Sequence, residues 1–143
     1  MFKLIKHLPN LSSTESITRT FSRNMNLKVL VKRLEEYGDS RIAADWDNVG
    51  LLVEPCDNLD VKRVLLTNDL TEPVLDEAIK KEINLIISYH PAIFKPLTKL
   101  TLNEWKQRSI VTCINNKIAV YSPHTAWDSI DGGINDWILK PFG

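Results

Sequence analysis

Short apolar runs alternate with helical patterns between residues 61 and 122, and this alternation constrains the fold more than any other feature. Residues 61–67, 85–87 and 118–122 are predicted strands, and the second of these is continuously apolar, as in a strand covered on both faces. Helical patterns separate them, one capped by Thr71 and one over residues 103–116. Strands that alternate with helices predict βαβ units, so we expect an α/β fold with a mostly parallel sheet and flanking helices.

Further elements are expected on both sides of this series, and we predict one domain over residues 25–143. Asn26 can cap a helix that Gly38 would end, with its apolar residues on one face: Leu27, Leu30, Val31, Leu34 and Tyr37. A loop rich in Asp and Asn follows, and then a short apolar run at residues 50–53. A short helix is expected around Ile134, Trp137 and Ile138.

Residues 1–24 differ in composition from the rest of the chain and are predicted to form a leader. They contain seven Ser or Thr, four basic residues and a single acid, which is typical of a mitochondrial transit peptide. The segment Arg19-Thr20-Phe21-Ser22 resembles a matrix-processing site with cleavage after Phe21. The alternative is a disordered extension before a functional start at Met25. The predicted location is therefore cytoplasmic, mitochondrial or both.

The charge distribution argues against direct binding of nucleic acid. The whole chain is neutral, but residues 25–143 hold 14 basic and 17 acidic residues, whereas nucleic-acid-binding domains usually present a basic face. No run approaches the roughly 18 apolar residues of a membrane span, so no membrane partner is predicted. Cys56 and Cys113 form no CxxC pair, and we predict Cys113 to be a core residue rather than a nucleophile.

Each of the three central strands ends in residues that can bind a metal or move a proton. Asn68 and Asp69 follow the first strand and His90 the second, while His124 and Asp128 follow the third. Ligands of open α/β sheets bind beyond the carboxyl ends of the strands, so these side chains are expected along one edge. Imidazole and carboxylate are the ligand set of zinc, iron or manganese.

Each candidate also has a structural alternative. His90 could equally be a hydrogen-bonded histidine at a strand end. Asp69 could cap the helix after Asn68, a role that we favour over ligation, and Asp128 could cap a following turn. His124 and Asp128 would share a face only if their segment is helical.

Several common enzyme motifs are absent from the sequence. It contains no P-loop, GxGxxG, HExxH or GxSxG, so NTPase, dinucleotide-binding, zincin and α/β-hydrolase functions lose their usual support. The four tryptophans are predicted to be core or interface anchors rather than base-stacking platforms: Trp46, Trp105, Trp127 and Trp137.

Several segments, taken together, resemble the animal branch of the Nif-three-like family (NGG-one-interacting-factor-like), in its N-terminal half only. Some bacterial members of that family are named GTP cyclohydrolase I type 2-like. The resemblance covers about residues 25–143 in the family's order and spacing, and the ordered set is specific where one segment would not be. The segments are Asp45-Trp46-Asp47-Asn48-Val49-Gly50-Leu51, Thr67-Asn68-Asp69-Leu70-Thr71, Ser88-Tyr89-His90-Pro91, Ser122-Pro123-His124-Thr125-Ala126-Trp127-Asp128 and Gly132-Gly133-Ile134-Asn135.

The resemblance implies a two-metal site. In the family, the ligands are two adjacent histidines after a strand, an aspartate in an HTxxD-type segment, and a histidine and a glutamate near the C-terminus. His90 matches the second histidine, Asp128 matches the aspartate, and His124 matches a position near the metals. Tyr89 stands where the family has its first histidine, and the chain ends at Gly143 without a counterpart to the closing histidine and glutamate.

The resemblance implies a divalent-metal-binding protein (zinc, iron or manganese) with two candidate functions. One is a metal-dependent hydrolase, in which a metal-bound water opens the ring of a purine nucleotide. The other is a non-enzymatic interaction protein, such as a transcription co-regulator, with a structural metal site. A homo-oligomer is expected for the complete protein. With two ligands, His90 and Asp128, the present chain is expected to bind metal weakly and to lack appreciable hydrolase activity.

Overall fold

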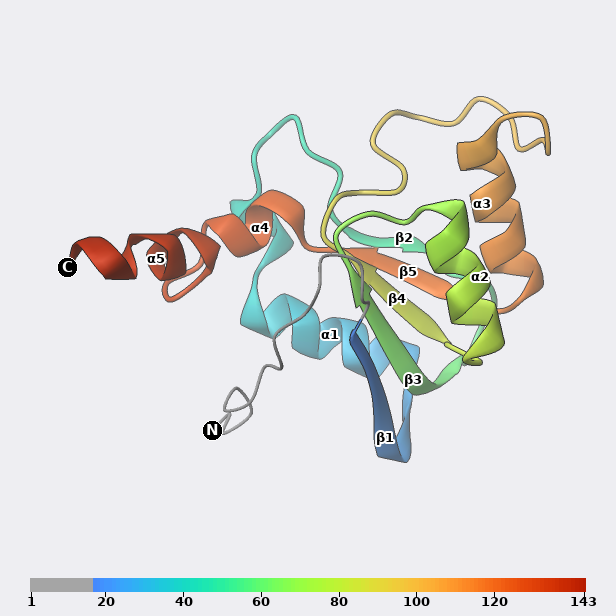
Figure 1. Ribbon diagram of the computed structural model, residues 1–143, viewed down its shortest axis with the longest axis horizontal. Coiled ribbons are helices and arrows are strands. Elements are labelled where there is room, and N and C mark those ends of the chain that lie inside the picture. The colour runs from blue at the N-terminus through green and yellow to red at the C-terminus, as the bar shows by residue number, and fades with distance from the viewer. Residues whose placement is uncertain (1–16) are drawn as a thin grey trace.

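The computed structural model describes the backbone of residues 17–143 and the side chains of residues 25–143, and a five-stranded sheet forms its centre. The strands are β1 (Ile17–Asn26), β2 (Gly50–Val53), β3 (Asp60–Thr67), β4 (Leu85–Ser88) and β5 (Ala119–Ser122). Their order in the sheet is β1-β3-β4-β5-β2 (Figure 1). The three central strands run parallel, whereas β1 and β2 run antiparallel to their neighbours. The predicted α/β fold is confirmed, but its parallel part is limited to the three central strands.

The parallel centre follows from two helical crossovers. Helix α2 (Glu72–Lys80) joins β3 to β4, and α3 (Trp105–Asn115) joins β4 to β5. Strands β4 and β5 are buried along their whole length, which explains their continuous apolar character. Strands β1 and β2 precede the first crossover and belong to no βαβ unit, so no connection requires them to be parallel.

Alternate residues of the central strands build two cores, one on each face of the sheet. Leu65, Ile86 and Val120 face α2 and α3 and pack with residues of those helices. Their neighbours along the strands face α1 (Leu27–Tyr37) on the other side of the sheet, as Figure 1 shows: Val64, Leu85, Ile87, Ala119 and Tyr121. In the part of the chain that the structure describes, the sheet is therefore covered by helices on both faces.

Helix α1 begins at the predicted Asn26 cap and ends at the predicted Gly38, but Gly38 is required there for a different reason than predicted. The Asn26 side chain accepts a hydrogen bond from the Lys28 amide, as a helix cap should. Gly38 follows the helix in an extended conformation rather than the left-handed one. A Cβ there would lie 2.5 Å from Cδ1 of Trp127, so glycine is needed for space and not for backbone freedom.

Buried residues bear out some of the sequence predictions for cysteine and tryptophan. Cys113 has no exposed surface, and burial raises the pKa of its thiol to about 12, which confirms a core role. Trp127 packs against the core on the α1 side and stacks edge-on with Tyr37. The other three tryptophans are exposed by 64%, 41% and 68%, so they do not lie in the core, and the interface alternative stays a prediction for them: Trp46, Trp105 and Trp137.

Part of the predicted leader belongs to the sheet. Residues 17–20 pair with residues 63–66 of β3, so the predicted boundary between residues 24 and 25 falls inside β1. Residues 1–16 lie outside the described part of the chain, and the transit-peptide hypothesis stays a prediction. Within the described residues, no helix combines the length and the apolar character that crossing a membrane requires.

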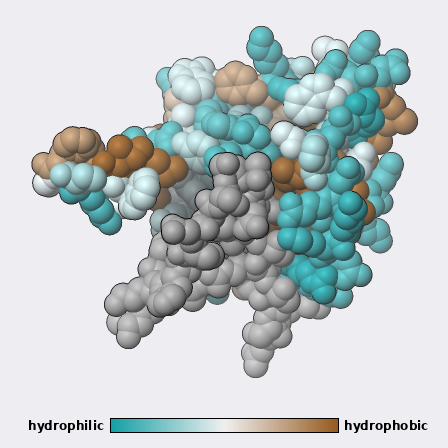
Figure 2. Space-filling view, in the orientation of Figure 1, coloured by the Kyte–Doolittle hydropathy of each residue, from teal (hydrophilic) through white to brown (hydrophobic). Residues whose placement is uncertain are grey.

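The C-terminal segment projects from the body of the molecule. It consists of α5 (Ile134–Leu139) and a final 3-10 turn (Lys140–Phe142), it follows the packed helix α4 (His124–Asp128), and α5 lies away from the sheet in Figure 1. Four of its large apolar side chains are exposed by 52–84%, and Figure 2 shows brown, hydrophobic atoms on the projection: Trp137, Ile138, Leu139 and Phe142. The predicted short helix is present, but it covers no part of the core that the structure describes.

Candidate functional site

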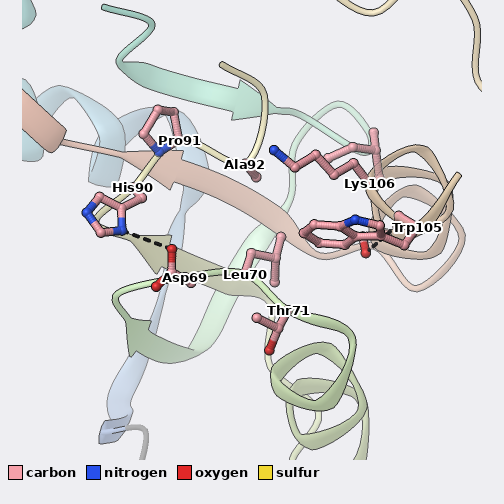
Figure 3. Close-up of a pocket in the computed structure, with 10 residues that line it drawn as sticks. Asp69, Leu70, Thr71, His90, Pro91, Ala92, Trp105 and Lys106 are labelled. Carbon is pink, nitrogen blue, oxygen red and sulfur yellow. Dashed lines mark hydrogen bonds and ion pairs between the residues drawn. The ribbon is translucent and has the colours of Figure 1, made fainter. Parts of the chain in front are cut away.

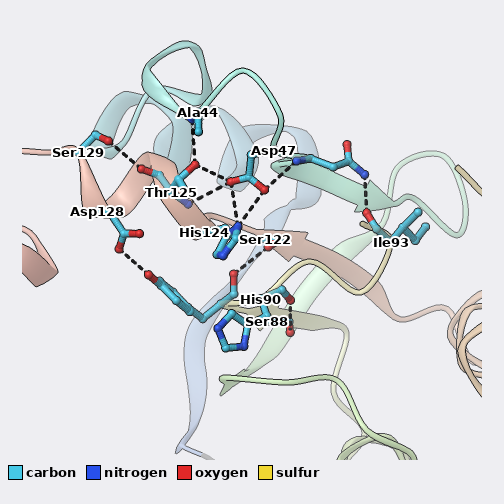
Figure 4. A network of polar contacts seen from close by, with 12 residues as sticks. Ala44, Asp47, Ser88, His90, Ile93, Ser122, His124, Thr125, Asp128 and Ser129 are labelled. Atoms are coloured by element: carbon cyan, nitrogen blue, oxygen red, sulfur yellow. Dashed lines mark hydrogen bonds and ion pairs between the residues drawn. The ribbon is translucent and has the colours of Figure 1, made fainter. Parts of the chain in front are cut away.

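The carboxyl ends of β3, β4 and β5 meet at one edge of the sheet, where backbone and hydroxyl groups fix the first residues of each loop (Figure 4). The buried hydroxyl of Ser88 donates to the carbonyl of His90 at 2.8 Å, and the buried hydroxyl of Ser122 donates to the carbonyl of Tyr89 at 2.9 Å. The amide of His90 donates to the carbonyl of Asn68. Two small hydroxyl residues at the strand ends therefore hold the Tyr89-His90 backbone in place.

Three rings converge at this edge. The ring centroids of Tyr89 and His90 are 5.1 Å apart, and that of His124 lies 5.6 Å from each of them. All three pairs meet edge to face, which is a favourable geometry for aromatic rings. The two histidines predicted from the sequence are thus brought together. Tyr89, which directly precedes His90, contacts both of their rings.

A carboxylate fixes the tautomer of each histidine. Nδ1 of His90 lies 2.9 Å from Asp69, and Nδ1 of His124 lies 2.8 Å from Asp47. An ionised carboxylate only accepts hydrogen bonds, so Nδ1 carries the proton and Nε2 of the neutral ring keeps a lone pair. The first pair is about half exposed, whereas the Asp47 side chain has no exposed surface.

Both helix-capping alternatives are wrong. Helix α2 begins after Thr71, and Asp69 instead accepts the hydrogen bond from His90. Helix α5 begins after Gly133, whereas Asp128 is the last residue of α4. The segment from His124 to Asp128 is helical, as a shared face requires, and both end residues contact Tyr89.

Tyr89 is a hydrogen-bond donor to Asp128 rather than a free phenol. Its hydroxyl contacts Oδ1 of that carboxylate. Burial, the hydrogen bond to Asp128 and the negative charges of Asp128 and Asp47 raise the pKa of Tyr89 to about 12. The phenol therefore stays protonated at neutral pH, and it occupies one oxygen of a predicted metal ligand.

Asp47 is a site residue that sequence reasoning missed. Its carboxylate accepts hydrogen bonds from the His124 ring, from the amide and hydroxyl of Thr125 and from the amide of Asn48. Burial alone would raise the pKa of Asp47, but these hydrogen bonds together lower it. The only signal in the sequence was its place in a segment that carries the family resemblance, because its two distant partners, His124 and Thr125, lie 77 and 78 residues away.

The Asp47 contacts also secure an unusual backbone conformation. His124 has a φ of +30°, which non-glycine residues rarely adopt. The hydroxyl of Thr125, which donates to Asp47, accepts the amide of Ala44 at 3.0 Å. These bonds join the loop before β2 to the start of α4, so the position of the His124 ring depends on both segments.

The donor set suits a divalent metal in kind but not in number. His90 offers a free Nε2 and Asp128 a carboxylate, and both contact Tyr89. In the part of the chain that the structure describes, however, no group of three or more His, Cys, Asp or Glu side chains is placed to hold a metal ion. Protein metal sites usually take three or four protein ligands, so residues 25–143 do not form a closed site by themselves.

The chain is similar to known proteins over most of its length. A family model described as Duf34/NIF3 (NGG1p interacting factor 3) matches residues 25–143. NIF3-like protein 1 of Drosophila melanogaster is 56% identical over 121 residues, which cover 85% of this chain and 41% of the relative. The GTP cyclohydrolase 1 type 2 homolog of Bacillus subtilis is 36% identical over 83% of this chain and 32% of the relative.

The fold has a counterpart among solved structures. The crystal structure of a Bacillus cereus protein related to NIF3 aligns with a TM-score of 0.76 and 35% sequence identity. The alignment covers 85% of this chain and 33% of that protein. The present chain thus spans less than half the length of each of these relatives.

Proposed function

Because the chain belongs to the Duf34/NIF3 family, we propose that it contributes His90 and Asp128 to a divalent-metal site at the carboxyl edge of its sheet. The observation that supports this proposal is that two histidines converge at that edge and that a carboxylate holds Nδ1 of each. Histidines that bind metals almost always donate their other ring N–H to such a partner. The remaining ligands come from outside residues 25–143, in keeping with the chain's partial coverage of its relatives.

The proposed ligands differ in how ready they are to bind. The His90 side chain is 50% exposed, and its Nε2 is free to coordinate. Asp128 must share its carboxylate with the Tyr89 hydroxyl, which leaves one oxygen uncommitted. The raised pKa of Tyr89 makes it a poor ligand, so we assign it the role of orienting Asp128.

The proposed activity is that of a metal-dependent hydrolase acting on a nucleotide-like substrate, since one relative is named as a GTP cyclohydrolase homolog. A bound dication would lower the pKa of a coordinated water from about 15.7 toward about 7 and supply hydroxide at neutral pH. Beside it, His124 would offer Nε2 as a proton acceptor, because the buried Asp47 holds the proton on Nδ1.

A second candidate function is a non-enzymatic interaction protein, such as a transcription co-regulator, with a structural metal. The supporting observation is the exposed apolar surface of α5 and the turn after it, which includes Trp137 and Phe142. Exposed patches of this kind often mark protein contacts. The description of the family also refers to an interacting factor.

Turnover distinguishes the two candidates. A chain extended by the remainder of the Drosophila relative is incubated with GTP and either zinc or manganese, and ring-opened product is followed by chromatography. The hydrolase proposal expects metal-dependent product that His90→Ala abolishes. Stoichiometric metal without product from GTP would contradict the hydrolase and favour the interaction protein.

A further inference from the structure

A cavity of about 200 Å³ lies beside the proposed metal site, between the loops after β3 and β4 and the first turns of α3 (Figure 3). The His90–Asp69 pair borders one end, and Trp105 and Lys106 border the other. Leu70 and Ile110, both buried, form part of its apolar lining. The cavity therefore joins polar groups at the sheet edge to an aromatic wall at the start of α3.

The volume limits what the cavity can hold. Sites for drug-sized ligands usually measure about 300–1,000 Å³. A cavity of about 200 Å³ is smaller, so it suits one ring system rather than a complete nucleotide. The rest of such a ligand would extend toward His90 and the sheet edge.

The aromatic wall offers a stacking surface. Trp105 is 41% exposed although it begins a helix whose later residues enter the core. The ammonium group of Lys106 lies over the Trp105 ring, 5.5 Å from its centroid, so a ligand that stacks on the indole would displace it or use the opposite face. An indole face and a nearby cation together favour a planar aromatic ligand that carries a hydrogen-bond acceptor.

The lining of the cavity offers no cluster of cations for phosphate. Asp69 lies in its wall, and two further acids, Glu72 and Glu104, adjoin the lining residues Thr71 and Trp105 in the sequence. Arg108 is committed to Glu72 and to the carbonyl of Leu102, which leaves Lys106 as the cation facing the cavity among the residues that line it. The Asp69 side chain is 63% exposed and can accept hydrogen bonds beyond the one from His90.

We propose that this cavity is a subsite for an uncharged, planar nitrogen heterocycle that stacks on Trp105. Lys106 would donate to a ring acceptor, and Asp69 would accept from a ring N–H. The inference rests on the proposed function in that the heterocycle would belong to a substrate of the same site. It assigns the recognition of the ring to residues outside the metal ligands.

Binding to the 143-residue chain in EDTA tests the subsite apart from the metal. The probes are guanosine, adenosine, uridine and inorganic triphosphate, titrated separately and followed by the chemical shifts of the tryptophan indole N–H groups. We expect saturable binding of at least one nucleoside and none of triphosphate. Trp105→Leu should weaken that binding about tenfold or more, as expected for one lost base–aromatic stack, and Lys106→Gln should weaken it as well.

Trp137→Leu is the matched control, because Trp137 is also exposed but lies on α5, and it should leave nucleoside binding unchanged. Thermal unfolding of Trp105→Leu verifies that the variant folds. Failure of all three nucleosides to saturate, tighter binding of triphosphate, or unchanged binding in both Trp105→Leu and Lys106→Gln would overturn the subsite. Metal content of the extended chain is measured separately. Absence of nucleoside binding by the unaltered protein beside intact metal binding overturns the subsite alone, and nucleoside binding without metal binding overturns the metal proposal alone.

Discussion

At the scale of single residues, the buried carboxylate of Asp47 connects the most distant parts of the site. It receives hydrogen bonds from His124, Thr125 and Asn48 and has no exposed surface. A buried acceptor of this kind stabilises the fold only while all of its donors stay paired. The residue therefore fixes a ring of the candidate site and contributes to the stability of the whole domain.

Asp47→Asn is expected to lower the free energy of unfolding by about 2 kcal/mol, because the amide turns a donor toward groups that need an acceptor. Urea denaturation at neutral pH measures the loss. The control is Asp57→Asn, whose side chain is 86% exposed and pairs only with Lys28 at the surface. A loss for Asp47→Asn no larger than that for Asp57→Asn would contradict the structural role of Asp47.

Because the pKa of Asp47 is lowered in the folded protein, the stabilisation that Asp47 provides should depend on pH. A carboxyl whose pKa is lower in the folded state stabilises the protein above its ordinary value of 3.8, and the contribution is lost as pH falls through the folded pKa. The difference in stability between the wild type and Asp47→Asn should therefore shrink below pH 3.8. A difference that grows with acid would contradict this assignment.

Tyr89 stands where the family resemblance implies the first of two adjacent histidines, and a substitution can restore that histidine. Tyr89→His removes the phenol from Asp128 and adds an imidazole beside His90. Loss of a side chain that only orients a metal ligand changes metal affinity about 10–100-fold, so a new ligand should tighten zinc binding by about tenfold or more. Competition with a zinc-chelating dye measures the affinity.

Tyr89→Phe is the matched variant for this test. It frees the Asp128 carboxylate but adds no donor, so its zinc affinity should stay well below that of Tyr89→His. Equal affinities in the two variants would show that the imidazole at this position does not reach the metal.

At the scale of elements, periodicity predicted most of the fold because most elements are local. The crossover helices, the three central strands and the helix over Leu27–Tyr37 all follow from spacing, caps and apolar runs within the segment itself. The antiparallel edges could not be predicted in this way. β2 pairs with β5 across about 70 residues, and no local pattern in Gly50–Val53 specifies that partner.

If the transit-peptide hypothesis is right, cleavage would remove part of strand β1. Cleavage after Phe21 would remove residues 17–20, which pair with residues 63–66 of β3. It would keep Met25 and Asn26, which pair with Val61 and Asp60 at the start of β3. The shortened protein would have a partly open sheet edge. The hypothesis therefore predicts that processing changes the pairing at this edge of the sheet.

A reporter fused to residues 1–24 tests the hypothesis. We expect delivery to mitochondria and processing near Phe21, observed by cell fractionation and N-terminal sequencing of the product. Replacing Arg19 and Arg23 with Gln is the control and should reduce import, because basic residues are typical of transit peptides. A reporter that remains cytosolic and unprocessed would leave Met25 as the functional start.

At the scale of the molecule, the candidate site was predictable in its location but not in its contacts. The sequence alone predicts that His90, His124 and Asp128 lie at one edge, because ligands bind beyond the carboxyl ends of parallel strands. The pairing of Tyr89 with Asp128 spans 39 residues and that of His124 with Asp47 spans 77. Such contacts depend on how the loops fold back, which no local pattern in the chain specifies.

The exposure of α5 and the small number of proposed metal ligands can be considered together. The chain spans 41% of its Drosophila relative, and the exposed apolar residues of α5 lie on a segment that no described element covers. Residues that complete the metal site and those that cover α5 would both come from outside residues 25–143. Metal affinity should therefore depend on the length of the chain more than on any surface substitution.

Metal content after dialysis tests the central claim most directly. The 143-residue chain and the chain extended by the remainder of the Drosophila relative are loaded with zinc or manganese, dialysed and measured by elemental analysis. Two protein ligands rarely retain a dication, so the shorter chain should keep little metal and the extended chain at least one ion per protomer. His90→Ala or Asp128→Ala in the extended chain should lower that content. Stoichiometric metal in the shorter chain, or unchanged content in the extended His90→Ala protein, would contradict the account.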